Sequence, residues 1–317
     1  MKKAFPLLLG LIVALSLLAI AACSSAPAPT PTPIPAAASY PLTVTDFQGR
    51  SVQIPQKPVR IVTTHPEATE LLYQIGGTAV GCDASSKYPS DVQALPKIGG
   101  AMSISTEAIS ALNPDLILIE SLTQTSLVNS LEQLGVPIVA LRAASLDDIT
   151  KGLTLVGEII DAKDAAAQAI VDIQDRIEAA QGNCTGNKTV LILISDAQRN
   201  IYAAKPESYP GSVAALLNLG NPAKGMPDNG PYPGFTMFTG EQALTSNPDI
   251  VFTISPAPAP APRLSTMLPQ IPGFNQMSSV KAGHVIELDL MLFLQAPGPR
   301  IADAVEEMLG LVNGVNP

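Results

Sequence analysis

The sequence predicts an α/β fold with two Rossmann-like lobes, each with a mostly parallel sheet, joined by a single long helix and enclosing a ligand cleft between them. Short apolar runs alternate with helical segments in both halves of the chain. Residues 146–181 contain no strand pattern and separate the two halves. Residues 107–115 (EAISALNPD) and 241–249 (EQALTSNPD) share one pattern, and each is followed by an apolar run, which indicates one related unit in each lobe.

The segment before the lobes has the features of an export signal and a stalk. A basic start and an apolar run over residues 5–20 lead through two alanines to Cys23. This pattern is typical of a lipoprotein signal peptide over residues 1–22, with Cys23 as the acylated N-terminus; an ordinary signal peptide and a transmembrane helix are the alternatives. Residues 23–39, an acylated cysteine and a Pro/Ala-rich stalk, favour extended polyproline II. We therefore expect an extracytoplasmic protein anchored by its N-terminal lipid, in the periplasm or on the outer face of the cell membrane.

Charge and residue counts exclude several classes of partner and site. The net charge of −9 disfavours nucleic acid as a partner. Two histidines, with no HExxH motif and no paired CxxC motifs, do not predict a metal site made by the protein alone. Cys82 and Cys184 fall in different predicted lobes, so we expect two separate thiols. We expect a monomer.

The elements of the first lobe, residues 40–160, follow from strand and helix signals. Residues 42–54 indicate a hairpin with its turn at Gly49, and a helix that begins near Pro66 is ended by two glycines. Further strands are predicted at residues 59–64, 80–83, 115–120 and 137–141.

A long helix is predicted to connect the lobes over residues 161–182. Ile170, Ile173 and Ile177 are spaced for one helical face. The second lobe, residues 183–317, then begins with a strand at residues 189–194.

In order along the chain, several segments together resemble the periplasmic binding proteins of ABC importers for vitamin B12 and iron complexes such as siderophores and haem. The segments are RIVTTHPEATELLYQIGG, VGCDASSKYP with LPKIGG, STEAISALNPDLILIE, LEQLGVPIVAL, SLDDI, GEQALTSNPDIVF and GPRIADAVEEML, from about residue 59 to 313. The resemblance implies two α/β lobes on one long helix and a partner made of an ABC permease dimer with its ATPase subunits. It implies no enzymatic activity and no resident cofactor.

The resemblance also implies a role for the repeated glutamates. In the family, one glutamate on each lobe meets arginines of the permease, and those positions match Glu107 and Glu241. The alternative for each is a helix N-terminal carboxylate stabilised by the helix dipole.

The carboxyl ends of the predicted strands nominate the residues of the cleft, because open α/β sheets bind ligands there. Phe293 is added by resemblance, since it matches a position where relatives carry a large aromatic residue. The predicted cleft residues are His65, Ser85, Met102, Ser103, Glu120, Arg199, Tyr202, Tyr232 and Phe293. Further candidates beside them are Thr64, Asp83, Ala84, Ser86, Ser121, Ser195, Asp196 and Tyr209.

The bound ligand is expected to be a metal chelate. His65 follows a strand and precedes Pro66, so it is a candidate axial ligand to the metal of a bound chelate; a helix-capping or packing histidine is the alternative. Few cations are available for an anionic ferric siderophore, and the first lobe looks most like the B12-binding members, so a corrinoid is favoured over an iron-siderophore or haem. An extracytoplasmic hydrolase or a scaffold lipoprotein is the competing class, although no nucleophile motif is present.

A Pro-Ala repeat at residues 255–263 follows a predicted strand on the side of the cleft. It is interpreted as a solvated spacer, with a cleft rim or a permease-facing loop as alternatives.

Overall fold

The computed structural model describes residues 39–185, 187–257 and 260–315. The predicted signal peptide, Cys23 and almost all of the predicted stalk lie outside the described residues. Within these ranges, no helix combines the length and the apolar character that a membrane span needs.

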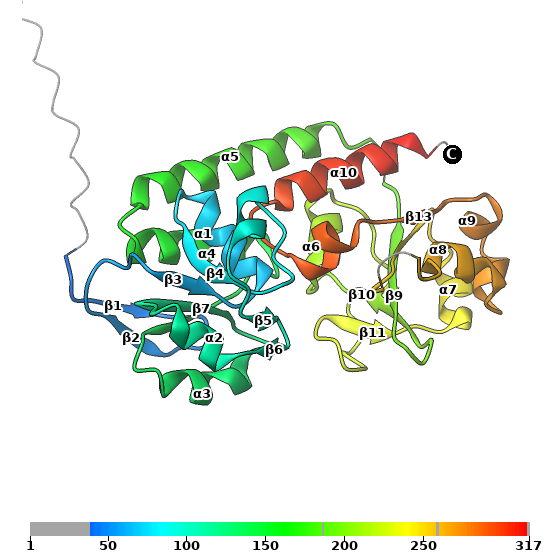
Figure 1. Ribbon diagram of the computed structural model, residues 1–317. Coiled ribbons are helices and arrows are strands. Elements are labelled where there is room, and N and C mark those ends of the chain that lie inside the picture. Colours follow the sequence, from blue (N-terminus) through cyan, green and yellow to red (C-terminus); the bar gives the residue numbers. More distant parts are fainter. Residues whose placement is uncertain (1–38, 186, 258–259, 316–317) are drawn as a thin grey trace, which may run out of the picture. The chain divides into compact units, whose positions relative to one another are not determined.

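The first lobe is built on a fully parallel sheet (Figure 1). Its strand order is β4-β3-β7-β8, and separate antiparallel hairpins are formed by β1 with β2 and by β5 with β6. The strands are β1 (Leu42–Thr45), β2 (Ser51–Ile54), β3 (Ile61–Thr63), β4 (Ala79–Cys82), β5 (Gly99–Gly100), β6 (Ser103–Ile104), β7 (Leu116–Glu120) and β8 (Ile138–Leu141). The helices are α1 (Pro66–Gln74), α2 (Thr106–Ala111), α3 (Val128–Glu132) and α4 (Leu146–Ile159), with 3₁₀ turns at Ser90–Ala94 and Thr125–Leu127.

The second lobe has a mixed sheet of order β11-β10-β9-β12-β13. Its strands are β9 (Val190–Ser195), β10 (Ile201–Ala204), β11 (Phe235–Met237), β12 (Ile250–Ile254) and β13 (Val285–Glu287). Its helices are α6 (Tyr209–Leu216), α7 (Gly240–Ser246), α8 (Leu264–Met267), α9 (Ser278–Lys281) and α10 (Ile301–Gly314), with 3₁₀ turns at Leu268–Gln270 and Phe274–Gln276 and a π-helical turn at Met291–Gln295.

The two-lobed α/β fold with mostly parallel sheets is as predicted, and in the second lobe one strand, β10, runs against the other four. β10 runs antiparallel to both β9 and β11, whereas β9, β12 and β13 are parallel. The cause is a tight turn at residues 196–200, which returns the chain directly beside β9. Arg199 adopts the left-handed conformation there (φ 64°), and its N–H donates to the carbonyl of Asp196 at 3.1 Å.

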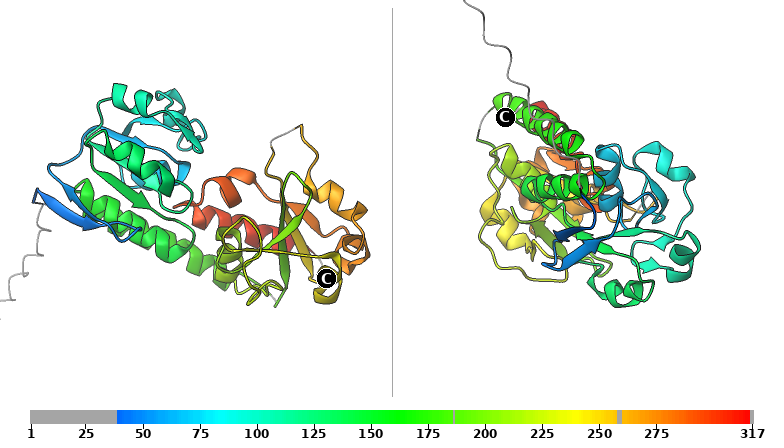
Figure 2. Two further views of the ribbon diagram at one scale, coloured as in Figure 1. Left: turned by 90° about the horizontal axis from the view of Figure 1, so that it is seen from below. Right: turned by 90° about the vertical axis from the view of Figure 1, so that its left-hand side faces the viewer.

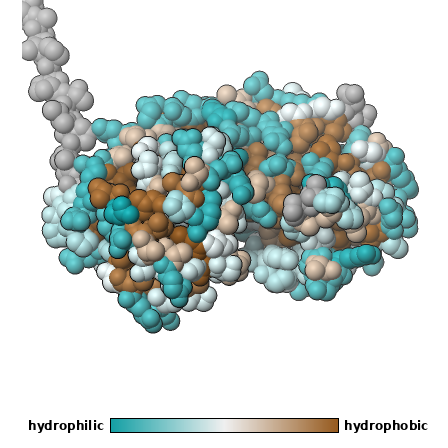
Figure 3. All heavy atoms as spheres, in the orientation of Figure 1, coloured by the Kyte–Doolittle hydropathy of each residue, from teal (hydrophilic) through white to brown (hydrophobic). Residues whose placement is uncertain are grey.

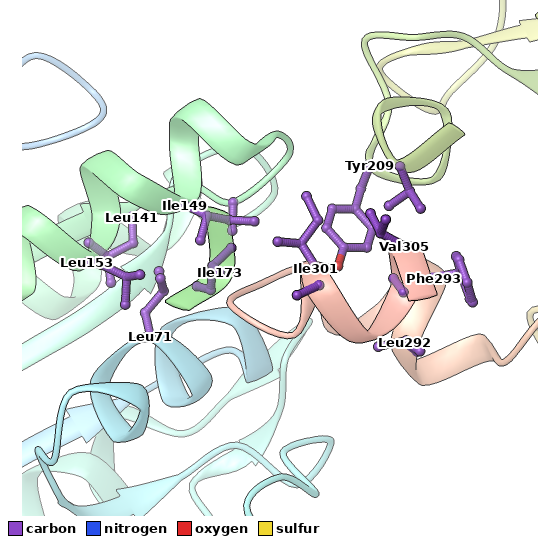
Figure 4. Close-up of a cluster of buried hydrophobic side chains, with 14 of the residues drawn as sticks. Leu71, Leu141, Ile149, Leu153, Ile173, Tyr209, Leu292, Phe293, Ile301 and Val305 are labelled. Carbon is purple, nitrogen blue, oxygen red and sulfur yellow. The ribbon is translucent and has the colours of Figure 1, made fainter. Parts of the chain in front are cut away.

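Alternate side chains of the central strands enter different cores. Leu116 and Leu118 of β7 pack into the core that faces α1 and α4, while Ile117 and Ile119 pack against α2 and α3. This alternation follows from the two-residue period of a strand, and both faces are apolar because helices cover both faces. The larger core continues from the first lobe through α5 to α6 and α10, and Figure 4 shows its side chains in both lobes.

The repeated Asn-Pro-Asp segments have the same structure in both lobes. Asn113 and Asn247 both adopt positive φ, 46° and 37°, directly after α2 and α7. The Asp115 carboxylate accepts the backbone N–H groups of Val59 and Arg60 at 2.9 Å, beside β3. Asp249 accepts the N–H of Thr189 at 2.7 Å, beside β9. Each repeat therefore ends a helix and ties the next strand to its neighbour.

The helix α5 (Lys163–Gly182) connects the lobes at the predicted position. Its 20 residues extend over about 30 Å, and it packs against α4 and α10 (Figures 1 and 2). Arg176 forms ion pairs with Asp303 and Glu306 of α10 at 2.7 and 2.6 Å. The surface along α5 is mostly hydrophilic (Figure 3).

A buried ion pair joins the lobes at a second place. Arg300, just before α10, donates from Nε and Nη2 to the two carboxylate oxygens of Glu70 on α1, at 2.9 and 2.7 Å. The guanidinium also lies over the ring of Tyr88, 4.5 Å from its centroid. Glu70 is 3% exposed. Burial raises its pKa, and the hydrogen bonds from Arg300 oppose that rise.

The two cysteines of the lobes are free thiols, as predicted. Cys82 is buried at the end of β4, and Cys184 follows α5.

Removing one partner of the Glu70–Arg300 pair is expected to lower the stability of the fold. In Arg300→Met the Glu70 carboxylate stays buried without its two donors, which is expected to lower the free energy of unfolding by about 3 kcal/mol. Arg176→Met, the control, breaks an exposed network and is expected to cost about 0–1 kcal/mol. Urea denaturation measures both values.

Equal losses in the two variants would mean that the Glu70–Arg300 pair contributes no more than a surface contact. Adding Glu70→Met to Arg300→Met is expected to restore most of the lost stability, because no uncompensated buried charge remains.

Candidate functional site

A cavity of about 370 Å³ is walled by residues of both lobes. This volume lies at the lower end of the range of about 300–1,000 Å³ that is usual for ligand pockets. The first lobe contributes His65, Glu67, Glu120, Leu122, Thr123, Arg142 and Ala144. The second contributes Glu207, Ser208, Tyr209, Pro210, Asp228, Pro233, Gly234, Phe235, Leu294 and Pro297.

The first wall is formed where parallel strands end. His65 follows β3, Glu120 is the last residue of β7, and Arg142 and Ala144 follow β8. The sheet therefore positions these side chains in the way that the topology of open α/β sheets predicts.

His65 caps α1 and lines the cavity at the same time. Its Nδ1 accepts the backbone N–H of Glu67 at 3.4 Å, which leaves Nε2 as the nitrogen that can face a ligand. Burial lowers its pKa, and the negative charges of Glu120 and Asp83 oppose this effect. The capping role that was an alternative in the sequence is thus present, and a ligand role stays a prediction.

Glu120 lines the cavity with a carboxylate that already accepts hydrogen bonds from the loop after β7. It accepts the N–H groups of Leu122 and Thr123 at 2.7 and 2.6 Å and the hydroxyl of Thr123 at 2.6 Å. These bonds fix the loop after β7, so Glu120 shapes the wall and adds negative charge to it.

Glu67 was not predicted from the sequence. It is 3% exposed, lines the cavity, and has an Oε1 atom that is buried without a hydrogen-bond partner. Burial raises its pKa well above the usual range, and the charges of Glu120 and Asp148 add to the rise. Arg142 opposes the rise, but its Nε lies 3.1 Å from Oδ2 of Asp148.

The second wall is mainly apolar with an acidic edge. Tyr209, at the first position of α6, and Phe235 of β11 supply aromatic surface, and burial raises the pKa of the Tyr209 hydroxyl. Lys205 does not line the cavity; its Nζ pairs with Asp228 and lies 3.6 Å from Glu207. Among the described residues that line the cavity, Arg142 is the only lysine or arginine.

Several predicted cleft residues lie elsewhere. Ser85, Met102 and Ser103 do not line the cavity, and the Met102 side chain is 77% exposed on the turn between β5 and β6. Arg199 forms the turn between β9 and the antiparallel strand β10.

The tyrosines near β10 also lie outside the cavity lining. Tyr202 is buried in β10, and its hydroxyl donates to Asp196 at 3.0 Å. Its ring packs edge-to-face against Tyr232, with 5.3 Å between the centroids.

The placement of Phe293 in the cleft is wrong. Its side chain is completely buried in the core with Leu292 (Figure 4). The next residue, Leu294, lines the cavity instead. The π-helical turn at Met291–Gln295 sets which side chains face the core, and no sequence pattern indicates such a turn.

The two glutamates proposed to dock occupy matching places. Glu107 and Glu241 are exposed, and each is the second residue of a short helix, after the caps Ser105 and Thr239. Hydrogen bonds from its own backbone and from the Ser105 hydroxyl lower the pKa of Glu107. Both carboxylates are thus presented to solvent as charges, and their docking role stays a prediction.

The family model of the periplasmic binding proteins matches residues 61–290. The uncharacterized ABC transporter substrate-binding lipoprotein YvrC of Bacillus subtilis is 24% identical over 279 residues, 85% of this chain and 84% of that protein. A cobalamin-binding protein of Halobacterium salinarum is 24% identical over 281 residues, 86% of this chain and 74% of that protein. The structure is similar to that of S. aureus IsdE complexed with heme, with a TM-score of 0.69, 22% identity, and coverage of 80% of this chain and 98% of that one. The chain belongs to the periplasmic binding protein family.

Proposed function

We propose that this protein is the substrate-binding lipoprotein of an ABC importer, which captures a metal chelate and delivers it to a permease dimer with its ATPase subunits. The observation that carries the proposal is the cavity that both lobes wall on a fixed two-lobed frame. Family membership and the ABC transporter lipoprotein among the relatives support it.

The charge and the apolar character of the cavity wall favour a corrinoid as the cargo. Glu120, Glu207 and Asp228 line it against the single cation Arg142 among its described lining residues, which disfavours an anionic ferric siderophore. A corrinoid carries neutral amide groups around a broad apolar ring system and suits aromatic and apolar walls. The cobalamin-binding relative supports this choice.

Haem is the second candidate, and one observation favours it. Nε2 of His65 remains available in the cavity after Nδ1 caps α1, and imidazole is a common axial ligand of haem iron. The similarity to the haem complex of IsdE concerns the fold.

The proposal includes neither bond chemistry nor a resident cofactor. His65 uses Nδ1 for the helix cap, and no serine or cysteine hydroxyl or thiol is hydrogen-bonded to its ring within the described ranges. A hydrolase would need such a nucleophile beside its base.

The proposal also includes the membrane anchor. Cys23 and the signal before it lie outside the described residues; the sequence pattern and the lipoprotein relative support acylation of Cys23.

Binding is tested with the soluble protein from Tyr40 onward and with cyanocobalamin, haemin and a ferric siderophore, by calorimetry. Cyanocobalamin is expected to bind, and Ala144→Phe, which places a ring in the inter-lobe cavity, is expected to weaken binding at least about tenfold. Thr245→Phe is the matched control, because it places the same ring in a surface hollow of α7 beside Glu241.

Equal affinities in the Ala144→Phe and Thr245→Phe variants would remove the cavity as the binding site. Binding of haemin alone, with a Soret band that changes in His65→Ala, would select haem over the corrinoid.

The docking role of the exposed glutamates is tested by charge reversal. Glu107→Lys with Glu241→Lys is expected to leave cargo affinity unchanged and to abolish uptake by cells that depend on this importer, because the charges that set register on the permease are inverted. Glu132→Lys with Glu178→Lys changes the net charge equally at exposed positions of α3 and α5 and is expected to leave uptake intact. Normal uptake in the first double variant would contradict the docking role.

Acylation is tested by Cys23→Ser. The variant is expected to lose incorporation of labelled fatty acid and to leave the membrane fraction, because the thiol that carries the lipid is gone. Labelling and membrane retention equal to the unsubstituted chain would exclude Cys23 as the anchor.

A further inference from the structure

The wall of the inter-lobe cavity contains a buried acid to which the proposed function assigns no role. Glu67 is the second residue of α1 and 3% exposed, and its Oε1 reaches no donor. An ionised carboxylate in such a place is unfavourable, because it loses water while Oε1 gains no hydrogen bond; the backbone of Ala143 offsets part of this cost and lowers the pKa of Glu67, but burial is the larger effect. The positive end of the α1 dipole favours the charge, but this effect is small beside the loss of solvation.

Two of the three charges that shift the pKa of Glu67 act in the same direction as burial. Glu120 from the end of β7 and Asp148 from α4 are negative, and both raise the pKa of Glu67, after burial as the largest cause. Arg142 is the opposing cation; its Nε lies 3.1 Å from Oδ2 of Asp148 but makes no hydrogen bond.

The described lining residues of the second lobe include no lysine or arginine that could stabilise an ionised Glu67. Across the cavity the second lobe presents Glu207 and Asp228, and Lys205 behind them is paired with Asp228. His65, the neighbouring cap, has a pKa that burial lowers, so its ring is neutral at neutral pH.

We propose that Glu67 is a neutral carboxylic acid whose O–H donates a hydrogen bond to an uncharged carbonyl oxygen of the cargo, such as an amide. The partner has to be uncharged, because a carboxylate would face Glu120, Glu207 and Asp228. Glu67 thereby selects amide-bearing chelates over carboxylate-bearing ones. This inference rests on the proposed function for the cargo, but the protonation of Glu67 is independent of it.

The affinity for cyanocobalamin, measured from neutral to alkaline pH, tests whether Glu67 donates a hydrogen bond to the cargo. Wild-type affinity is expected to fall as Glu67 loses its proton. Glu67→Gln keeps a donor at every pH and is expected to bind within about threefold of wild type at neutral pH, with a flat profile. Glu67→Met, of similar volume but without a donor, is expected to bind about tenfold more weakly. The control Glu178→Gln removes an exposed carboxylate of α5 and is expected to keep the wild-type profile.

Unfolding measured against pH tests the protonation without any cargo. Above the ordinary glutamate pKa of about 4.3 the unfolded chain loses a proton that folded Glu67 keeps. Wild-type stability therefore falls as pH rises from there to the raised pKa in the folded state. Glu67→Gln lacks this contribution, so its stability relative to wild type is expected to grow with pH over that window. Glu120, Asp148, Arg142 and His65 are present in both proteins and cancel in the difference.

Each outcome decides a separate question. Parallel stability profiles of wild type and Glu67→Gln would show an ionised Glu67 and overturn the inference, whatever binds. Equal affinity in Glu67→Met and wild type would overturn the hydrogen bond to the cargo. Failure of cyanocobalamin, haemin and the siderophore to bind, with diverging stability profiles, would overturn the proposed cargo and the bond to it, and would leave the neutral acid established.

Discussion

The geometry of the cavity depends on how the two lobes are held at a fixed distance, and the bidentate pair between Glu70 and Arg300 is central to this. The chain passes from one lobe to the other through α5, which fixes their separation at one edge. A helix alone permits rotation about its ends, and the buried pair supplies a second attachment in which two parallel hydrogen bonds fix direction as well as distance. Because Glu70 is buried, water cannot readily replace Arg300 as its hydrogen-bond donor. Moving Arg300 away would therefore leave a buried carboxylate without its donors, which costs free energy.

The repeated unit shows how one sequence pattern positions both structure and surface. The aspartates 115 and 249 hold β7 and β12 to their neighbours at the amino ends of the strands. A short helix that precedes a strand and packs beside it runs back along the strand, so the N-termini of α2 and α7 lie toward the carboxyl ends. Glu107 thus lies toward the same edge of its sheet as the cavity residues of the first lobe. In the second lobe, Phe235 pairs with the carboxyl end of the antiparallel β10, so it lies toward the amino end of β9, and Glu241 lies toward the opposite edge of that sheet.

Sequence reasoning succeeded where a residue's role follows from its local pattern. The apolar run LILIE predicted β7, because a short run of consecutive apolar residues is typical of a strand that is buried on both faces. His65 was predicted to lie in the cleft because it stands between a strand and Pro66. It failed where tertiary structure decides. Arg199 was assigned to the cleft, but a left-handed turn uses it to reverse the chain. Phe293 was displaced from the cleft by a single residue, because a π-helical turn shifts which side chain faces inward.

Glu67 shows a different limit. At the start of a helix a glutamate ordinarily indicates a solvated, dipole-stabilised carboxylate, and nothing in one sequence indicates that a second lobe will cover it. Glu207 and Asp228 come from irregular segments of that second lobe, so their approach to the first is equally invisible in the sequence. The acidic character of the cavity is therefore a property of the assembled lobes.

The placement of Glu67 and Glu70 on α1 has a further consequence. Residues three apart share one side of a helix, so a single side of α1 carries both a wall of the cavity and the anchor for Arg300. Only two residues separate Pro297, which lines the cavity, from Arg300. A shift of α1 would therefore change the width of the cavity and the Glu70–Arg300 ion pair together. Widening the cavity for a larger cargo by moving α1 would break this ion pair.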